Sequence, residues 1–211
     1  ARALDFARRL VTRAGAEHLV RPGPLLRIPQ LAIHLDREVN SGLTLDRQKH
    51  TTPVYGVGDA GDILQILADQ AGVDVEDIDG YDILTADTQE PRRFGHNNQF
   101  FASGRLDNLS AVHAGLSALL AAPTSDQHIS VFAAFDHEEL GSESRSGASG
   151  PFLADILSRI TQGLGGSARD GARALAGSWC LSADAGHAVH PNYPERHDPA
   201  NQPILGGGPL L

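Results

Sequence analysis

The pattern of hydrophobic and polar residues changes near residue 95. Before that point, segments 9–13 and 17–21 flank Ala14-Gly-Ala and predict a β-hairpin with a short loop. After it, long stretches rich in Ala and Leu alternate with short β-branched runs, which is typical of an α/β fold. The pattern therefore predicts a β-rich region with one helix, followed by alternating helices and strands.

The first region contains one clear amphipathic helix. Ile63, Ile66 and Leu67 share a helical face, and Asp59 or Asp62 stands where a cap is expected. Gly72 is expected to end this helix, because glycine adopts the left-handed conformation of a C-terminal cap. The run 81–87 predicts a strand.

The second region contains the remaining predicted elements. Helices are expected over residues 107–122, 151–164 and 171–176. The apolar runs 129–135 and 179–184 are expected to be buried strands of an α/β sheet.

Carboxylates follow both predicted strands. Glu138 and Glu139 come just after residue 135, and Asp184 ends the second run. Ligands of open α/β sheets gather beyond the carboxyl ends of strands, and adjacent carboxylates can divide metal binding from proton transfer. Asp107, at the start of a helix, adds a third position, and carboxylates buried together repel one another without a cation. The pattern therefore favours a metal-dependent hydrolytic site, and two divalent metals would need a bridging carboxylate with terminal ligands.

Each candidate also has a simpler interpretation. Asp107 could cap its helix, Asp184 could end its strand, and His34 could be an ordinary core or surface histidine. The local histidines are interpreted as supporting or structural rather than as direct ligands: His137, His187 and His190.

A GxGxxG pattern at 56–61 raises the possibility of a dinucleotide site. No hydrophobic strand runs into its first glycine, and Asp59 would place a negative charge where a pyrophosphate must lie. The pattern is interpreted as a loop.

Composition excludes several classes of protein. The net charge is −9 and no dense Lys/Arg block occurs, which argues against nucleic acid or an anionic membrane as a partner. No apolar run approaches the length of a membrane span. The single cysteine, Cys180, cannot form an internal disulfide, so a reduced, cytoplasmic location is expected. The chain contains no Met, and we expect it to be part of a longer product.

Three strings in the second region stand out: Arg105-Leu-Asp-Asn-Leu109, Asp136-His-Glu-Glu-Leu-Gly-Ser-Glu-Ser144 and the segment from Ser182 to Tyr193. They resemble the central motifs of the M18 metallopeptidases, the aspartyl aminopeptidases. Upstream, residues 27–35 and 82–89 resemble the inserted dimerisation domain of that family, so the similarity extends from about Leu19.

The resemblance implies a role for each matching residue. Asp107 resembles the carboxylate that bridges two zinc ions, Glu139 a ligand of one zinc, and Asp184 a terminal ligand of the other. Glu138 resembles the general base that deprotonates the attacking water. His34 matches a histidine that reaches from the dimerisation domain into the active site of a neighbouring subunit.

The implied fold is an α/β/α zinc-peptidase core at 96–211 with an inserted β-rich dimerisation domain at 1–95, both partly represented. The implied activity is a metalloaminopeptidase that removes amino-terminal Asp or Glu from peptides, using a water activated by two zinc ions. Dimers assembling into a dodecamer are implied as well.

Three features of the family are not matched. Its His-x-Asp motif near the amino terminus and its zinc histidine near the carboxyl terminus are not found in these residues, and Ala185-Gly186 departs from the third motif. Two alternatives therefore stay open: a di-metal hydrolase of other specificity, and a non-catalytic oligomerisation fragment.

Overall fold

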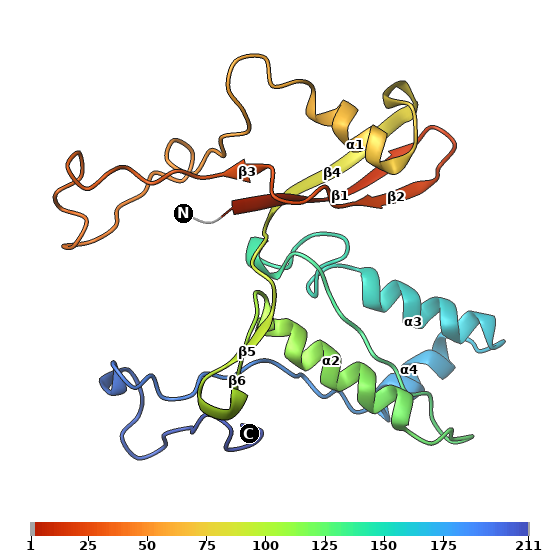
Figure 1. Cartoon of the computed structure of the whole chain (residues 1–211). Helices are drawn as coiled ribbons and strands as arrows, with labels where there is room; N and C mark the ends of the chain where they lie inside the picture. Colours follow the sequence, from red (N-terminus) through yellow and green to blue (C-terminus); the bar gives the residue numbers. More distant parts are fainter. Residues whose placement is uncertain (1–2, 211) are drawn as a thin grey trace. The chain divides into compact units, whose positions relative to one another are not determined.

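The computed structural model describes residues 3–210 and divides the chain into two compact units, Ala1–Gly104 and Arg105–Leu211. The first unit contains all the strands, and the second contains three of the four α-helices of the described residues (Figure 1). Together they form an α/β fold, as the sequence pattern predicts. Each unit is described by itself below.

A four-stranded antiparallel sheet organises the first unit around its central strand, β1 (Ala3–Thr12). β4 (Ile78–Asp87) pairs along nearly the whole length of β1, from Leu4↔Asp87 to Thr12↔Ile78. β2 (Glu17–Val20) and β3 (Leu26–Arg27) also pair with β1 and share its other edge. The predicted hairpin and the predicted strand at 81–87 are both confirmed.

Helix α1 (Ile63–Ala71) packs on this sheet and supplies part of its core. The Asp62 side chain accepts a hydrogen bond from the backbone N–H of Leu64 at 2.7 Å, and Gly72 ends the helix with a left-handed φ of 69°. Both boundaries agree with the sequence prediction. A short 3₁₀ turn, Val75–Asp77, then leads into β4. The buried hydrophobic side chains of the described residues all belong to this unit: Phe6, Leu10, Leu26, Leu67, Ala68 and Ala86.

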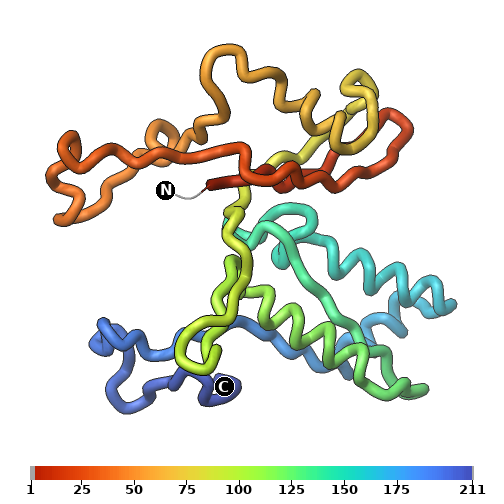
Figure 2. Tube along the Cα trace, in the orientation of Figure 1, coloured from red at the N-terminus to blue at the C-terminus, as the bar shows by residue number. Residues whose placement is uncertain are grey.

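Between β3 and α1 the chain makes a long excursion without helices or strands, residues 28–62 (Figure 2). An isolated bridge between Arg27 and Val54 closes its base. Several apolar side chains along it are exposed, including Leu31, Ile33 and Leu35. The glycine pattern at 56–61 lies here, and its interpretation as a loop is confirmed.

A second, two-stranded sheet was not predicted from the pattern. β5 (Arg92–Phe94) pairs with β6 (Phe100–Ala102), and the rings of Phe94 and Phe100 stack at 5.2 Å. The connecting 3₁₀ turn, His96–Asn98, uses a left-handed Asn97. Three residues per strand are too few for the alternation that normally identifies a strand.

The second unit contains helices α2 (Leu106–Ala121), α3 (Phe152–Gly163) and α4 (Ala168–Ala176). The sequence predicts all three, although α4 begins three residues earlier than expected. α3 and α4 pack against each other, and the side chains of Ser167 and Asp170 form a reciprocal cap on α4. None of the helices in residues 3–210 is long and apolar enough to cross a membrane.

The two strands predicted for the second unit are wrong for this chain. Residues 129–135 and 179–184 are coil, and their apolar side chains are largely exposed, with Ile129 at 62% and Trp179 at 99%. A strand needs a neighbour that supplies backbone hydrogen bonds, and the second unit offers none among its described residues. The hydrophobic runs predict the local preference but cannot supply the partner.

A buried ionic cluster supports the sheet of the first unit. The Asp5 and Arg8 side chains are almost fully buried, and Arg8 Nη2 lies 3.8 Å from Asp5 Oδ1. Asp5 also accepts hydrogen bonds from Arg21 Nε at 3.0 Å and from the N–H of Gly23 at 3.1 Å. Burial lowers the pKa of the Arg8 guanidinium, and the Asp5 charge opposes that shift.

Replacing Asp5 by Asn is therefore expected to destabilise this unit by about 3 kcal/mol, because it leaves the buried Arg8 charge without its counter-ion. A urea titration followed by circular dichroism measures the change. Glu17→Gln is the matched control: Arg9 and Glu17 are 3.7 Å apart but more than half exposed, so the expected change is below about 0.5 kcal/mol. Equal effects of the two variants would contradict the role of the buried pair.

Candidate functional site

Asp107 lies at an irregular start of α2. Arg105 has a left-handed φ of 60°, and Asp107 and Asn108 depart from helical geometry, with a cis peptide bond between them. Within the described part of the chain, the Asp107 carboxylate is exposed and takes part in no hydrogen bond or ion pair. The helix-cap interpretation of Asp107 is therefore not supported, and its carboxylate remains available to a ligand.

A side-chain hydrogen bond connects the Asp107 segment to the Asp184 segment. Asn108 Nδ2 donates to the backbone carbonyl of Ala183 at 3.4 Å, so the immediate neighbours of Asp107 and Asp184 are in contact. These segments are 75 residues apart in the sequence. The sequence analysis assigned no role to Asn108, and its place inside the first motif was the only available signal.

Glu138 and Glu139 lie in a tightly turned loop. They open a 3₁₀ turn, Glu138–Leu140, that follows a left-handed His137, and both are exposed. The preceding coil packs on α2, because a Cβ built at Gly115 would lie 2.8 Å from the ring of Phe132. Helix α2 thus carries Asp107 at its start and also contacts the coil that leads to the glutamates.

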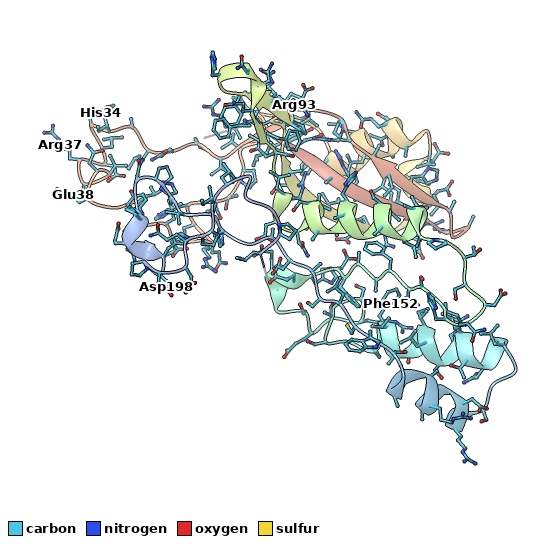
Figure 3. The ribbon with its side chains drawn as sticks, turned by 90° about the horizontal axis from the view of Figure 1, so that it is seen from below. His34, Arg37, Glu38, Arg93, Phe152 and Asp198 are labelled. Carbon is cyan, nitrogen blue, oxygen red and sulfur yellow. The ribbon has the colours of Figure 1, made fainter. Side chains whose placement is uncertain are left out.

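His34 belongs to the first unit and lies on the 28–62 excursion, near Arg37 and Glu38 (Figure 3). Its side chain is exposed and makes no contact with another ionisable group of the described residues. His34 is therefore a surface histidine rather than a core one.

Of the three local histidines of the second unit, His137 and His190 form side-chain hydrogen bonds. His137 Nδ1 lies 2.6 Å from Ser144 Oγ. His190 Nδ1 accepts the backbone N–H of Asn192 at 3.1 Å, and its ring contacts Tyr193. Within residues 3–210, no such bond involves His187.

The described residues fit zinc in donor type but do not enclose it. Carboxylate oxygens are suitable zinc ligands, and Asp107, Glu139 and Asp184 are all exposed. Across residues 3–210, however, no three His, Cys, Asp or Glu side chains converge on one position. Two surface cavities of the second unit, at the start of α3 and along residues 203–210, are lined by none of these carboxylates. The structure thus brings two of the motifs together and leaves the ligand set incomplete.

The sequence profile described as "Aminopeptidase I zinc metalloprotease (M18)" matches residues 10–211. This chain belongs to the M18 family. The match includes all three motif strings. It therefore includes the four candidate carboxylates: Asp107, Glu138, Glu139 and Asp184.

Relatives of known name agree with this assignment to M18. The chain is 49% identical over 218 aligned residues to a "Probable M18 family aminopeptidase 2" of Streptomyces coelicolor, covering all of this chain and 50% of the relative. Among solved structures, the chain resembles one described as "Cryo-EM structure of the Ape4 and Nbr1 complex", with a TM-score of 0.81 and 32% identity. That match covers 96% of this chain and 44% of the other.

The fold is shared with more distant M18 structures. One is described as "Structure of S. cerevesiae mApe1 dodecamer", with a TM-score of 0.72 at 24% identity, covering 96% of this chain and 48% of that one. The M18 chain described above thus spans about half the length of the curated relatives it matches.

Proposed function

We propose that this M18 chain is part of a zinc aminopeptidase that removes acidic amino-terminal residues from peptides. The observation that carries the proposal is the hydrogen bond from Asn108 to Ala183, which joins the first and third motifs next to Asp107 and Asp184. Exposed carboxylates on adjoining segments provide the oxygen donors that a di-metal hydrolase requires.

Each of the four carboxylates has its own role in the proposed reaction. Asp107 would be the ligand shared between two zinc ions, Glu139 would hold one of them and Asp184 the other. Zinc, when bound, polarises the scissile carbonyl and makes water a competent nucleophile at neutral pH. Glu138 accepts a proton from the attacking water and returns it to the leaving amine.

Residues 1–95, which make up most of the first unit, have a role in assembly. We assign residues 1–95 to a dimerisation insert and 96–211 to the catalytic core. The exposed Leu31, Ile33 and Leu35 on the 28–62 excursion support an intersubunit surface, and the dodecamer formed by the yeast relative supports a homo-oligomer. His34 on this excursion acts in the active site of the neighbouring subunit. The cellular location that we propose for the enzyme is the cytoplasm.

Cleavage of two chromogenic substrates tests this proposal. The full-length protein is incubated with aspartyl and leucyl p-nitroanilides, before and after removal of metal by a chelator. We expect a preference for the aspartyl substrate and recovery of activity when zinc is restored. A leucyl preference would favour a di-metal hydrolase of other specificity, and zinc binding without cleavage of either substrate would favour the non-catalytic alternative.

The zinc content of two variants distinguishes a metal ligand, Asp107, from the general base, Glu138. Asp107→Asn is expected to reduce bound zinc well below the wild-type content, because the bridging position contacts both ions, whereas Glu138→Gln should keep nearly all of it. Elemental analysis of the purified variants measures zinc per chain. Asp126→Asn, an exposed carboxylate outside the motifs, is the matched control. Equal zinc content in the Asp107 and Glu138 variants would remove Asp107 from the bridging role.

A further inference from the structure

The loop that carries Glu138 and Glu139 is held together by its own hydrogen bonds. The backbone carbonyl of His137 accepts the N–H groups of Leu140 at 3.1 Å and Ser142 at 3.0 Å, which closes the turn around both glutamates. The N–H of Asp136 donates to the carbonyl of Ser146 at 3.2 Å and fixes the entry to the loop. The two glutamates are therefore positioned by the conformation of His137.

The backbone conformation of His137 is uncommon outside glycine, although His adopts it more often than most other residue types. Its φ of 64° and ψ of 29° lie in the left-handed region, which non-glycine residues seldom occupy. Such a residue persists only where its surroundings hold it, and residues of this kind gather at functional sites. The side-chain contact that holds it is the 2.6 Å hydrogen bond between His137 Nδ1 and Ser144 Oγ.

Ser144 is in turn anchored to the rest of the loop. Its backbone carbonyl accepts the N–H of Gly147 at 3.1 Å, and its side chain is half-buried, unlike the exposed glutamates. Gly147 is buried, and a Cβ there would collide with the carbonyl oxygen of Ser142, so this part of the loop has little room to shift. Ser144 thus connects the turn that carries the glutamates to a closely packed segment.

We propose that Ser144 is a positioning residue for the general base: through His137 it holds the turn that sets the location of Glu138. This inference rests on the proposed function, in which Glu138 accepts the proton of the attacking water. Ser144 itself touches no reacting atom. A base displaced from its place acts poorly on the water proton, whereas substrate binding elsewhere is unaffected.

Kinetics and hydrogen exchange of the full-length protein test the inference together. Ser144→Ala is expected to lower kcat about 10-fold with little change in KM, because the base is displaced and substrate contacts are not. Ser144→Thr keeps the hydroxyl and should stay within about 2-fold of wild type. In the Ala variant, amide exchange of a peptide covering residues 137–142 should accelerate several-fold, because the N–H groups of Leu140 and Ser142 are less protected.

Two controls make the result specific. Ser149→Ala changes an exposed hydroxyl of the same loop without a side-chain partner in residues 3–210, and should leave kcat and exchange unchanged. The double variant His137→Ala/Ser144→Ala should be no slower than His137→Ala alone, because both changes break one connection. Multiplicative losses in the double variant, or equal losses in Ser149→Ala, would overturn the inference.

The outcomes also separate this inference from the function on which it rests. If Glu138→Gln abolishes activity while Ser144→Ala has normal kcat and normal exchange, only the role of Ser144 is wrong. If Glu138→Gln keeps wild-type activity, the base assignment fails and the role of Ser144 fails with it.

Discussion

Replacing Glu138 by Gln in the full-length enzyme is expected to lower kcat by at least about 100-fold, because the amide cannot accept the proton of the attacking water. The variant keeps the size and shape of the side chain, and Glu138 is exposed on a turn closed by backbone hydrogen bonds. Zinc content and folding should therefore stay near those of the wild type. Steady-state kinetics on an aspartyl substrate, with zinc measured on the same samples, provide the test.

Glu143→Gln is the matched control for this variant. Glu143 is an exposed glutamate of the same loop, so its replacement removes the same charge five positions away. We expect its kcat within about 3-fold of wild type, since an exposed charge without an assigned role in the reaction contributes little. Comparable losses in the two variants would point to the charge of the loop rather than to a base, and activity retained by Glu138→Gln would remove Glu138 from that role.

The elements that the sequence predicts correctly are those determined by local signals. Helix α1 has its cap at Asp62 and its left-handed glycine at Gly72, both readable from the residues themselves. The β1–β2 hairpin follows from two short segments around Gly15.

The elements that the sequence does not predict depend on distant partners. The runs 129–135 and 179–184 have the composition of buried strands, but no described strand of their unit pairs with them, so they remain coil. Sequence patterns identify the hydrophobic run, whereas pairing depends on what lies beside it.

For the candidate site, too, the sequence identifies local features and does not identify contacts between separate residues. The identities of Asp107, Glu138, Glu139 and Asp184 come from short motifs, which a sequence displays directly. The contacts beside them, from Asn108 to Ala183 and from Ser144 to His137, join residues 75 and 7 positions apart and require coordinates. Neither Asn108 nor Ser144 belongs to a residue type that would mark it as functional on its own.

Mixing two inactive variants is expected to restore activity if His34 acts across a subunit boundary. His34→Ala keeps Glu138, and Glu138→Gln keeps His34, so each homo-oligomer should be inactive by itself. In a mixed dimer, the subunit with an intact Glu138 receives an intact His34 from its partner. Random exchange at equal concentrations makes half of the dimers mixed, with one complete site in each, so roughly a quarter of wild-type activity should return.

The exposed position of His34 means that recovery of activity on mixing would report on this side chain and not on a folding defect. Its side chain is exposed on the 28–62 excursion, away from the buried core of its unit, so His34→Ala should leave that core intact. Arg37→Ala, which changes a residue near His34 on the same excursion, is the matched control. This variant is expected to be active without mixing. Subunit exchange is verified with two affinity tags before activity is measured. A His34 that acts within its own subunit gives no recovery, because each chain then carries its own lesion into its own site, and that result would end the assignment of His34 to the neighbouring active site.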